Sequence, residues 1–298
     1  MDTVEPVSRM TVGKLVAVTS CVVAFLAAPT LSSAAPASEW AQLHEEAMAS
    51  VLPAGGHHSR VALGDSIVKL VHEGVLDPKK FEALYAQRGG VPAGLKRALS
   101  EPSHRPILLT RETANVHVNL LWPLGLANRM AANNDSPLNG PRGFRFASTG
   151  GWNLGREASG AVYFNKFPIV GLTTQQEALV IKVALNTFRP CCDNSTFFQD
   201  CNHGSALLGL LALGAAQGRN EDELYREALA FNAFWFPHNY AYAALYFKAV
   251  RGTMWRDVNP REVMSANFSS ASGWSANVAR ELGQRGLVPQ QGGADCDA

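Results

Sequence analysis

The residues best suited to chemistry in this 298-residue chain lie in one stretch, residues 189–204. This stretch contains three of the five cysteines, Cys191, Cys192 and Cys201, together with the histidine His203. Thiolates and imidazoles are the ligands that zinc, copper and iron–sulfur centres prefer. The four side chains therefore form a candidate site for one transition metal ion (zinc, copper or iron). Their spacing is unspecific, because the Cys-x-x-Cys of common zinc fingers is missing.

The same stretch also suits thiol chemistry. Cys201 falls where we expect a helix to begin, and the free N–H groups and dipole of a helix N-terminus stabilise a thiolate. Cys201 can then act as a nucleophile and His203 as a proton carrier, with Cys191 or Cys192 as the resolving thiol. A thiol–disulfide or metal-dependent extracytoplasmic enzyme is therefore one alternative function.

A purely structural role for the cysteines is the third interpretation. Without Cys21 four cysteines remain, and an even number in an oxidising compartment predicts two disulfides. Four cysteines allow three pairings, among which the sequence does not choose; one of them joins Cys192 to Cys201 and Cys191 to Cys296. In the chain-entropy model the shorter loop contributes about 3 kcal/mol. The protein is then a binding or assembly module without catalysis, whose partner is a small molecule or another protein.

The amino-terminal residues 1–37 resemble a cleaved secretory signal peptide. Arg9 and Lys14 precede the apolar residues 15–29, and Ala35-Pro36-Ala37 provides the small residues of a cleavage site. The run is short for a membrane span, so we expect none in the mature chain. Residues 18–21 also fit a lipobox loosely, which would leave Cys21 lipidated. The pattern favours a soluble protein that is periplasmic or secreted.

Composition and helix punctuation predict a mostly α protein. Hydrophobic residues make up 47% of the chain and charged residues 17%, which is typical of a folded domain with a sizeable core. Residues 38–288 form one helical domain in this interpretation, and the Gly-rich residues 289–298 form a tail that is flexible or tethered through Cys296. Residues 205–217 are apolar nearly all round, so we expect them to form a buried central helix.

The remaining segments follow the same pattern. Residues 59–75 have helical spacing of their apolar positions, and residues 108–130 favour a helix despite Pro123. Residues 174–177 read as a capping box that opens another helix. Residues 131–160 are rich in Asn and Gly, which predicts an ordered loop or a short hairpin. We expect no ladder of strands.

One further histidine is a candidate site residue. His117 lies with Asn115 and Asn119 in an otherwise apolar segment, and polar groups that are buried there need partners. The formal net charge is only +1 and the basic residues are scattered, so no stripe of positive charge exists to follow a phosphate backbone. Nucleic acid is therefore not an expected partner.

Overall fold

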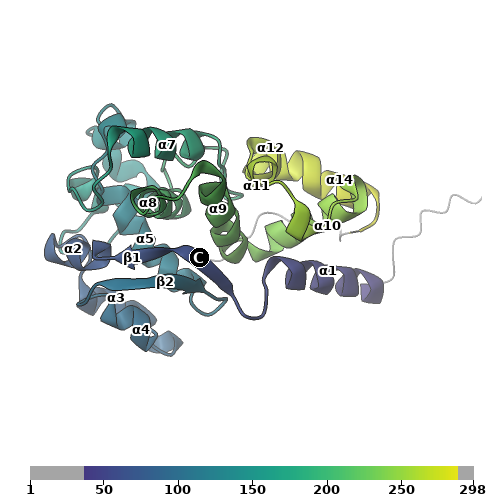
Figure 1. Cartoon of the computed structure of the whole chain (residues 1–298), viewed down its shortest axis with the longest axis horizontal. Helices are drawn as coiled ribbons and strands as arrows, with labels where there is room; N and C mark the ends of the chain where they lie inside the picture. Colours follow the sequence, from purple (N-terminus) through teal and green to yellow (C-terminus); the bar gives the residue numbers. More distant parts are fainter. Residues whose placement is uncertain (1–36, 288–298) are drawn as a thin grey trace, which may run out of the picture. The chain divides into compact units, whose positions relative to one another are not determined.

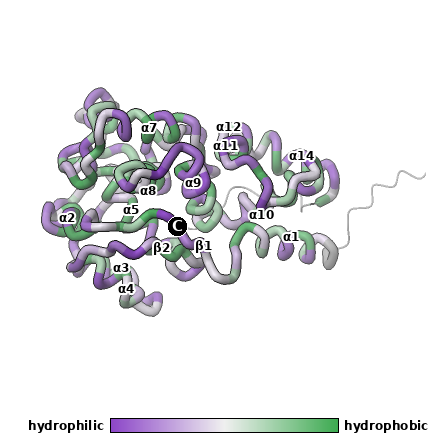
Figure 2. Tube along the Cα trace, viewed as in Figure 1, coloured by the Kyte–Doolittle hydropathy of each residue, from purple (hydrophilic) through white to green (hydrophobic). Residues whose placement is uncertain are grey.

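The predicted central helix is α8, which spans Asn202–Ala216 in the computed structural model (Figure 1). Every residue from His203 to Ala215 is buried, and most of the helix is pale or green in Figure 2 because leucine, alanine and glycine dominate it. The structure describes residues 37–287, and most of these lie in helices. The mostly α class, a single helical domain around this helix, is therefore confirmed.

The main partner of α8 is α5 (Ala114–Ala127), and the two backbones approach closely where glycines meet. A Cβ atom at Gly125 would overlap the carbonyl oxygen of Ser205, and one at Gly209 would lie 2.6 Å from the carbonyl oxygen of Leu121. The hydroxyl of Ser205 donates across the crossing to the carbonyl oxygen of Trp122 (3.0 Å). The helix expected within residues 108–130 is thus confirmed, and small residues determine how closely it packs on α8.

The amino-terminal part contains the strands that the sequence analysis missed. α1 (Ala37–Val51) packs on α10 (Pro237–Arg251), and β1 (His57–Gly64) pairs antiparallel with β2 (Ser103–Leu109) in a two-stranded sheet (Figure 1). The helix expected over residues 59–75 is wrong, because β1 occupies its first part and α2 (Ser66–His72) only the second. Between the strands lie α3 (Pro78–Tyr85), η1 (Ala86–Arg88) and α4 (Ala93–Arg97).

A buried carboxylate explains why residues 57–60 are extended. Glu227 accepts hydrogen bonds from His57 Nε2 (3.0 Å), from the hydroxyl of Ser59 (2.8 Å) and from the backbone N–H of Arg60 (2.8 Å). These bonds reach from β1 to α9 (Glu221–Trp235), some 170 residues along the chain. A contact of this range overrides the helical spacing of the apolar residues.

Residues 131–160 form an ordered loop, and the hairpin alternative is not seen. Short helical turns follow one another along it: η2 (Ala131–Asn133), η3 (Pro137–Asn139), η4 (Gly143–Arg145), α6 (Ala147–Gly150) and, at its end, η5 (Gly160–Tyr163). Trp152 is buried in this loop and donates its indole N–H to the carbonyl oxygen of Val75 (2.8 Å). The loop is therefore part of the packed structure.

Helices and connecting loops make up the carboxyl-terminal half of the described chain. α7 (Thr174–Leu185) begins with a capping box between Thr173 and Gln176, one residue earlier than the sequence indicated. After α10 come η6 (Trp255–Asp257), α11 (Pro260–Val263), α12 (Ala266–Ser269), α13 (Ala271–Trp274), the π-helical turn η7 (Ser275–Ala279) and α14 (Arg280–Gln284). Within residues 37–287, no helix is both long and apolar enough to cross a membrane.

The glycine crossing makes a direct prediction for stability. Gly125→Ala should lower the free energy of unfolding by about 1–3 kcal/mol, because the added methyl group forces α5 away from α8. Gly94→Ala in α4 is the matched control, since nothing lies within 4 Å of its new Cβ atom. Thermal unfolding followed by circular dichroism compares the two. Equal melting temperatures would show that the crossing tolerates a side chain.

Candidate functional site

The loop between α7 and α8 brings three cysteine sulfurs together. The Sγ atoms of Cys191, Cys192 and Cys201 all lie within 4.8 Å of one another, and those of Cys191 and Cys201 are 3.6 Å apart. Cys201 is the N-cap of α8, and its sulfur accepts a hydrogen bond from the backbone N–H of Gly204 (3.4 Å). The cysteine sulfurs that the sequence singled out are therefore neighbours in space.

A fully buried arginine lies beside these sulfurs. The side chain of Arg189 has no exposed surface, and its Nε donates to Cys201 Sγ at 2.9 Å. Its other nitrogens donate to the carbonyl oxygens of Asn194 (2.9 Å) and Phe198 (3.3 Å) and to the carboxylate of Asp200 (2.5 Å). The guanidinium thus holds the whole loop closed around itself.

Space for this guanidinium comes from a glycine in the first turn of α8. A Cβ atom at Gly204 would lie 2.6 Å from Cζ and from Nη2 of Arg189. Neither Arg189 nor Gly204 was expected from the sequence to be a site residue. A glycine three residues after Cys201 was the one sign of a close contact in the sequence. Only the folded chain shows that the side chain of Arg189, fifteen residues earlier, occupies the space that a Cβ atom at Gly204 would fill.

Other parts of the domain hold the loop in place. The backbone N–H of Thr196 donates to the carbonyl oxygen of Thr187 (2.8 Å). The side-chain amide of Asn232 donates to the carbonyl oxygen of Phe188 (2.9 Å). The N–H of Ala271 donates to the carbonyl oxygen of Cys192 (3.0 Å), which ties the cysteines to α13. The sulfurs are therefore positioned by elements that are distant in sequence.

The three cysteines of this cluster differ in the pKa of their thiol groups. Hydrogen bonds from Cys191 and Cys192, with the positive charge of Arg189, hold the pKa of Cys201 well below its usual value. The pKa of Cys191 is raised, because its thiol donates to neighbouring sulfurs and is buried, and that of Cys192 is raised to about 11. Cys201 is thus the most acidic thiol of the cluster, with Cys191 Sγ within hydrogen-bonding distance of its sulfur.

The disulfide expected between Cys192 and Cys201 is not formed in the structure, since Cys191, Cys192 and Cys201 are all free cysteines. The sulfur contact that forms is the one between Cys191 and Cys201, at 3.6 Å. The other expected pair, Cys191 with Cys296, lies partly outside the described residues.

His203 does not join the sulfurs. Its ring packs at 4.5 Å from Phe236 and 5.9 Å from Trp235, measured between ring centres, and burial lowers its pKa to about 4. The side chain is 2% exposed, and its Nε2 has no partner among the described residues. The group of ligand atoms in this part of the chain therefore consists of three cysteine sulfurs, and His203 lines a cavity that none of these cysteines lines.

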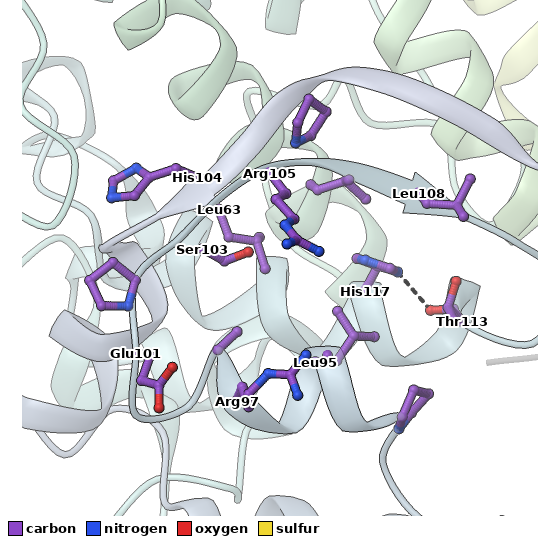
Figure 3. A pocket seen from close by; sticks show the side chains of 16 residues that line it. Leu63, Leu95, Arg97, Glu101, Ser103, His104, Arg105, Leu108, Thr113 and His117 are labelled. Atoms are coloured by element: carbon purple, nitrogen blue, oxygen red, sulfur yellow. Dashed lines mark hydrogen bonds between the residues drawn. The ribbon is translucent and has the colours of Figure 1, made fainter.

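His117 lies apart from the cysteines, at the wall of a pocket of about 640 Å³ between β2 and α4 (Figure 3). It lies in α5, and its Nδ1 donates to the carbonyl oxygen of Thr113 (2.9 Å). Burial lowers its pKa to about 4. Figure 3 shows Arg97 and Arg105 extending into the same pocket from α4 and β2. His117 is therefore a neutral buried histidine, and the structure does not bring it near the thiols.

Comparisons with known proteins add no relative to this description. No family model matches the chain, and neither a curated protein nor a solved structure gives a significant match. Function is therefore argued from the geometry of the site.

Arg189 should dominate the stability of the loop. Arg189→Met leaves the carboxylate of Asp200 and the thiolate of Cys201 without their buried counter-ion, which should cost about 3–5 kcal/mol in the free energy of unfolding. Arg256→Met is the control, because that side chain is 83% exposed and should change stability by less than about 0.5 kcal/mol. Chemical denaturation measures both. An unchanged midpoint for Arg189→Met would contradict the central role of this side chain.

His117 should make stability depend on pH. Its pKa is near 6.5 in the unfolded chain and about 4 in the folded protein, so the unfolded chain binds more protons between these values. Stability therefore falls as the pH drops from 6.5 to 4, by about 3 kcal/mol for this residue. His117→Asn should make that part of the profile less steep, with the remaining slope due to His203, whose pKa is also about 4, while His72→Asn at an exposed position of α2 should leave it unchanged. Identical profiles for wild type and His117→Asn would refute this.

Proposed function

We propose that this chain is an exported protein in which Cys191, Cys192 and Cys201 bind one soft transition metal ion. The observation that supports this most strongly is the gathering of three sulfurs within 4.8 Å. Thiolate ligands select zinc, copper(I) and iron in preference to harder ions such as magnesium or calcium. Zinc and copper(I) suit a single site of three sulfurs best.

The spacing of the sulfurs agrees with ligation. A zinc–sulfur bond of about 2.3 Å and a tetrahedral angle place two sulfur ligands about 3.8 Å apart. Cys191 and Cys201 have their sulfurs 3.6 Å apart, close to this value. A disulfide would need the same two atoms about 2.05 Å apart. The loop therefore needs little movement to accept an ion and considerably more to form a disulfide.

The charges of the site agree as well. Three thiolates together with Asp200 are a concentration of negative charge that cannot be buried alone. Arg189 already supplies one positive charge at 2.9 Å from Cys201 Sγ. One divalent zinc and this guanidinium therefore balance the three thiolates, and the partly exposed Asp200 carboxylate leaves the site with a net charge of −1. Arg189 would not bind the ion itself. Its hydrogen bond to Cys201 Sγ would orient this ligand, as residues next to metal ligands commonly do.

Export is supported by the sequence of residues 1–37. The basic residues Arg9 and Lys14, the apolar run and the small residues before Ser38 are the parts of a secretory signal. The destination is periplasmic or extracellular. In that compartment the cytoplasmic thiols would not compete with the protein for metal ions.

A second candidate function is thiol–disulfide exchange, favoured by the contact between Cys191 and Cys201. Arg189 and the N–H of Gly204 both donate to Cys201 Sγ, which keeps this sulfur nucleophilic. Cys201 would attack a substrate disulfide and release one substrate thiolate. Cys191, 3.6 Å away, would then displace the second substrate sulfur, so that the substrate leaves reduced and Cys191–Cys201 is oxidised.

Native mass spectrometry of the full chain, purified with zinc or copper(I), separates the two candidates. The metal proposal predicts one bound ion, which Cys191→Ser and Cys201→Ser should each weaken by at least about tenfold through loss of one ligand. Cys296→Ser, outside the loop, should keep the ion. A protein that stays free of metal and loses two hydrogens on oxidation, with a mapped Cys191–Cys201 bond, would favour exchange and defeat the metal proposal.

A further inference from the structure

A small cavity of about 210 Å³ lies where α5, the start of α8 and the loop of residues 131–160 meet. Amide side chains dominate its polar lining: Asn115 and Asn119 come from α5, Asn153 from the loop and Asn202 from α8. Among the described residues that line it, Arg88 is the only charged one. The cavity therefore offers mainly neutral hydrogen-bonding groups.

Two of these amides are oriented by a buried tyrosine. Nδ2 of Asn119 donates to the hydroxyl of Tyr85 (2.7 Å), which in turn donates to Oδ1 of Asn115 (3.0 Å). The asparagines are four residues apart on α5, so they lie on the same side of the helix. Tyr85 belongs to α3 and is buried, which anchors this chain of hydrogen bonds in the core. Asn115 keeps its Nδ2 as a free donor, and Asn119 keeps its Oδ1 as a free acceptor.

The amide of Asn202 also has hydrogen-bonding capacity left. Its Oδ1 accepts from the backbone N–H of His203 (3.0 Å), which orients the side chain and leaves Nδ2 as a donor. The free atoms of Asn115, Asn119 and Asn202 all keep some accessible surface. A molecule in the cavity can therefore reach two donors and one acceptor whose positions are fixed before it binds, which lowers the cost of binding.

Two indole rings supply much of the apolar lining. Trp122 and Trp152 meet edge to face, with 5.0 Å between their ring centres. Their N–H groups are already used, because they donate to the carbonyl oxygens of Ser148 (2.7 Å) and Val75 (2.8 Å). Trp122 is only half-buried, so its ring remains available for contact with a ligand. The electron-rich face of an aromatic ring attracts the weakly positive C–H groups of a saturated ring.

These groups together select a neutral molecule with several hydroxyls. A hydroxyl both donates and accepts, so neighbouring hydroxyls can pair with the donors of Asn115 and Asn202 and with the acceptor of Asn119. A carboxylate would have no donor for Asn119, and the only cation in the described lining, Arg88, is exposed. A purely apolar molecule would leave the amides unpaired, which costs free energy.

We propose that this cavity binds a single sugar ring. Its hydroxyls pair with the amides of Asn115, Asn119 and Asn202, and its C–H groups pack against Trp122. The exposed Asn153 adds a further amide from the loop. None of the three clustered cysteines lines the cavity, so the site does not depend on a bound metal ion.

Saturation-transfer difference NMR of the full chain tests this, with methyl β-glucoside, methyl α-mannoside and N-acetylglucosamine as probes. At least one of them is expected to bind saturably. Cyclohexanol has a saturated ring but a single hydroxyl, so it should bind at least about tenfold more weakly. Tyr85→Phe removes the hydroxyl that orients two of the amides, and it should weaken sugar binding by about 3- to 10-fold.

Two exposed asparagines provide the matched pair, which gives a result even if Tyr85→Phe is unstable. Asn153→Ala should weaken binding of the same sugar by at least about threefold. Asn186→Ala, which follows α7 and lies outside the cavity, should leave the affinity unchanged.

Two results would overturn the proposal. One is that none of the three sugars binds saturably, including the case in which acetate binds instead and Arg88→Gln abolishes its binding. The other is that a sugar binds but neither Asn153→Ala nor Tyr85→Phe lowers its affinity. Cys191→Ser should leave the sugar affinity unchanged, so this test does not depend on the metal proposal.

Discussion

The hydrogen bonds of the buried Arg189 guanidinium are the interaction on which the candidate site depends. An arginine without water must find acceptors for its donors, and here they are one sulfur, two carbonyl oxygens and a carboxylate from residues 194–201. This requirement fixes the path of the loop more strictly than hydrophobic packing can. It also brings Cys201 to the helix start beside Cys191, which lies two residues after the arginine.

The core beneath the loop follows from a different constraint, the close approach of two helix backbones. Gly125 and Gly209 leave no side chain between α5 and α8, so Ser205 can reach the carbonyl of Trp122. The first turn of α8 is thereby fixed from both sides. Arg189 packs against Gly204 on one side, and α5 lies on the other. A helix start packed in this way holds the sulfur of Cys201 in one position.

The elements that are determined by local sequence patterns were predictable from the sequence. The leucines and alanines of α8 identify a buried helix by themselves, and Pro123 did not prevent the prediction of α5. β1 was missed because the helical spacing of Ile67, Leu70 and Val71, which do lie in α2, was extended back over Val61 and Leu63, which alternate as in a strand. The contact that holds the strand is with Glu227. The clustering of cysteines was evident. Arg189 was not, because its burial depends on Gly204 and on residues that meet it only after folding.

The attachment of the cysteine loop to α13 bears on how the protein is made. The N–H of Ala271 and the N–H of Ser272 hold Cys192 and Asp193, so the loop lacks these anchors until the last helices have left the ribosome. The thiols are translated well before those anchors, and during that interval they are open to oxidants and to competing thiols. A chain that crosses a membrane amino-terminus first would finish assembling this loop only on the far side. The redox state and the metal content of that compartment would then decide what the cysteines become.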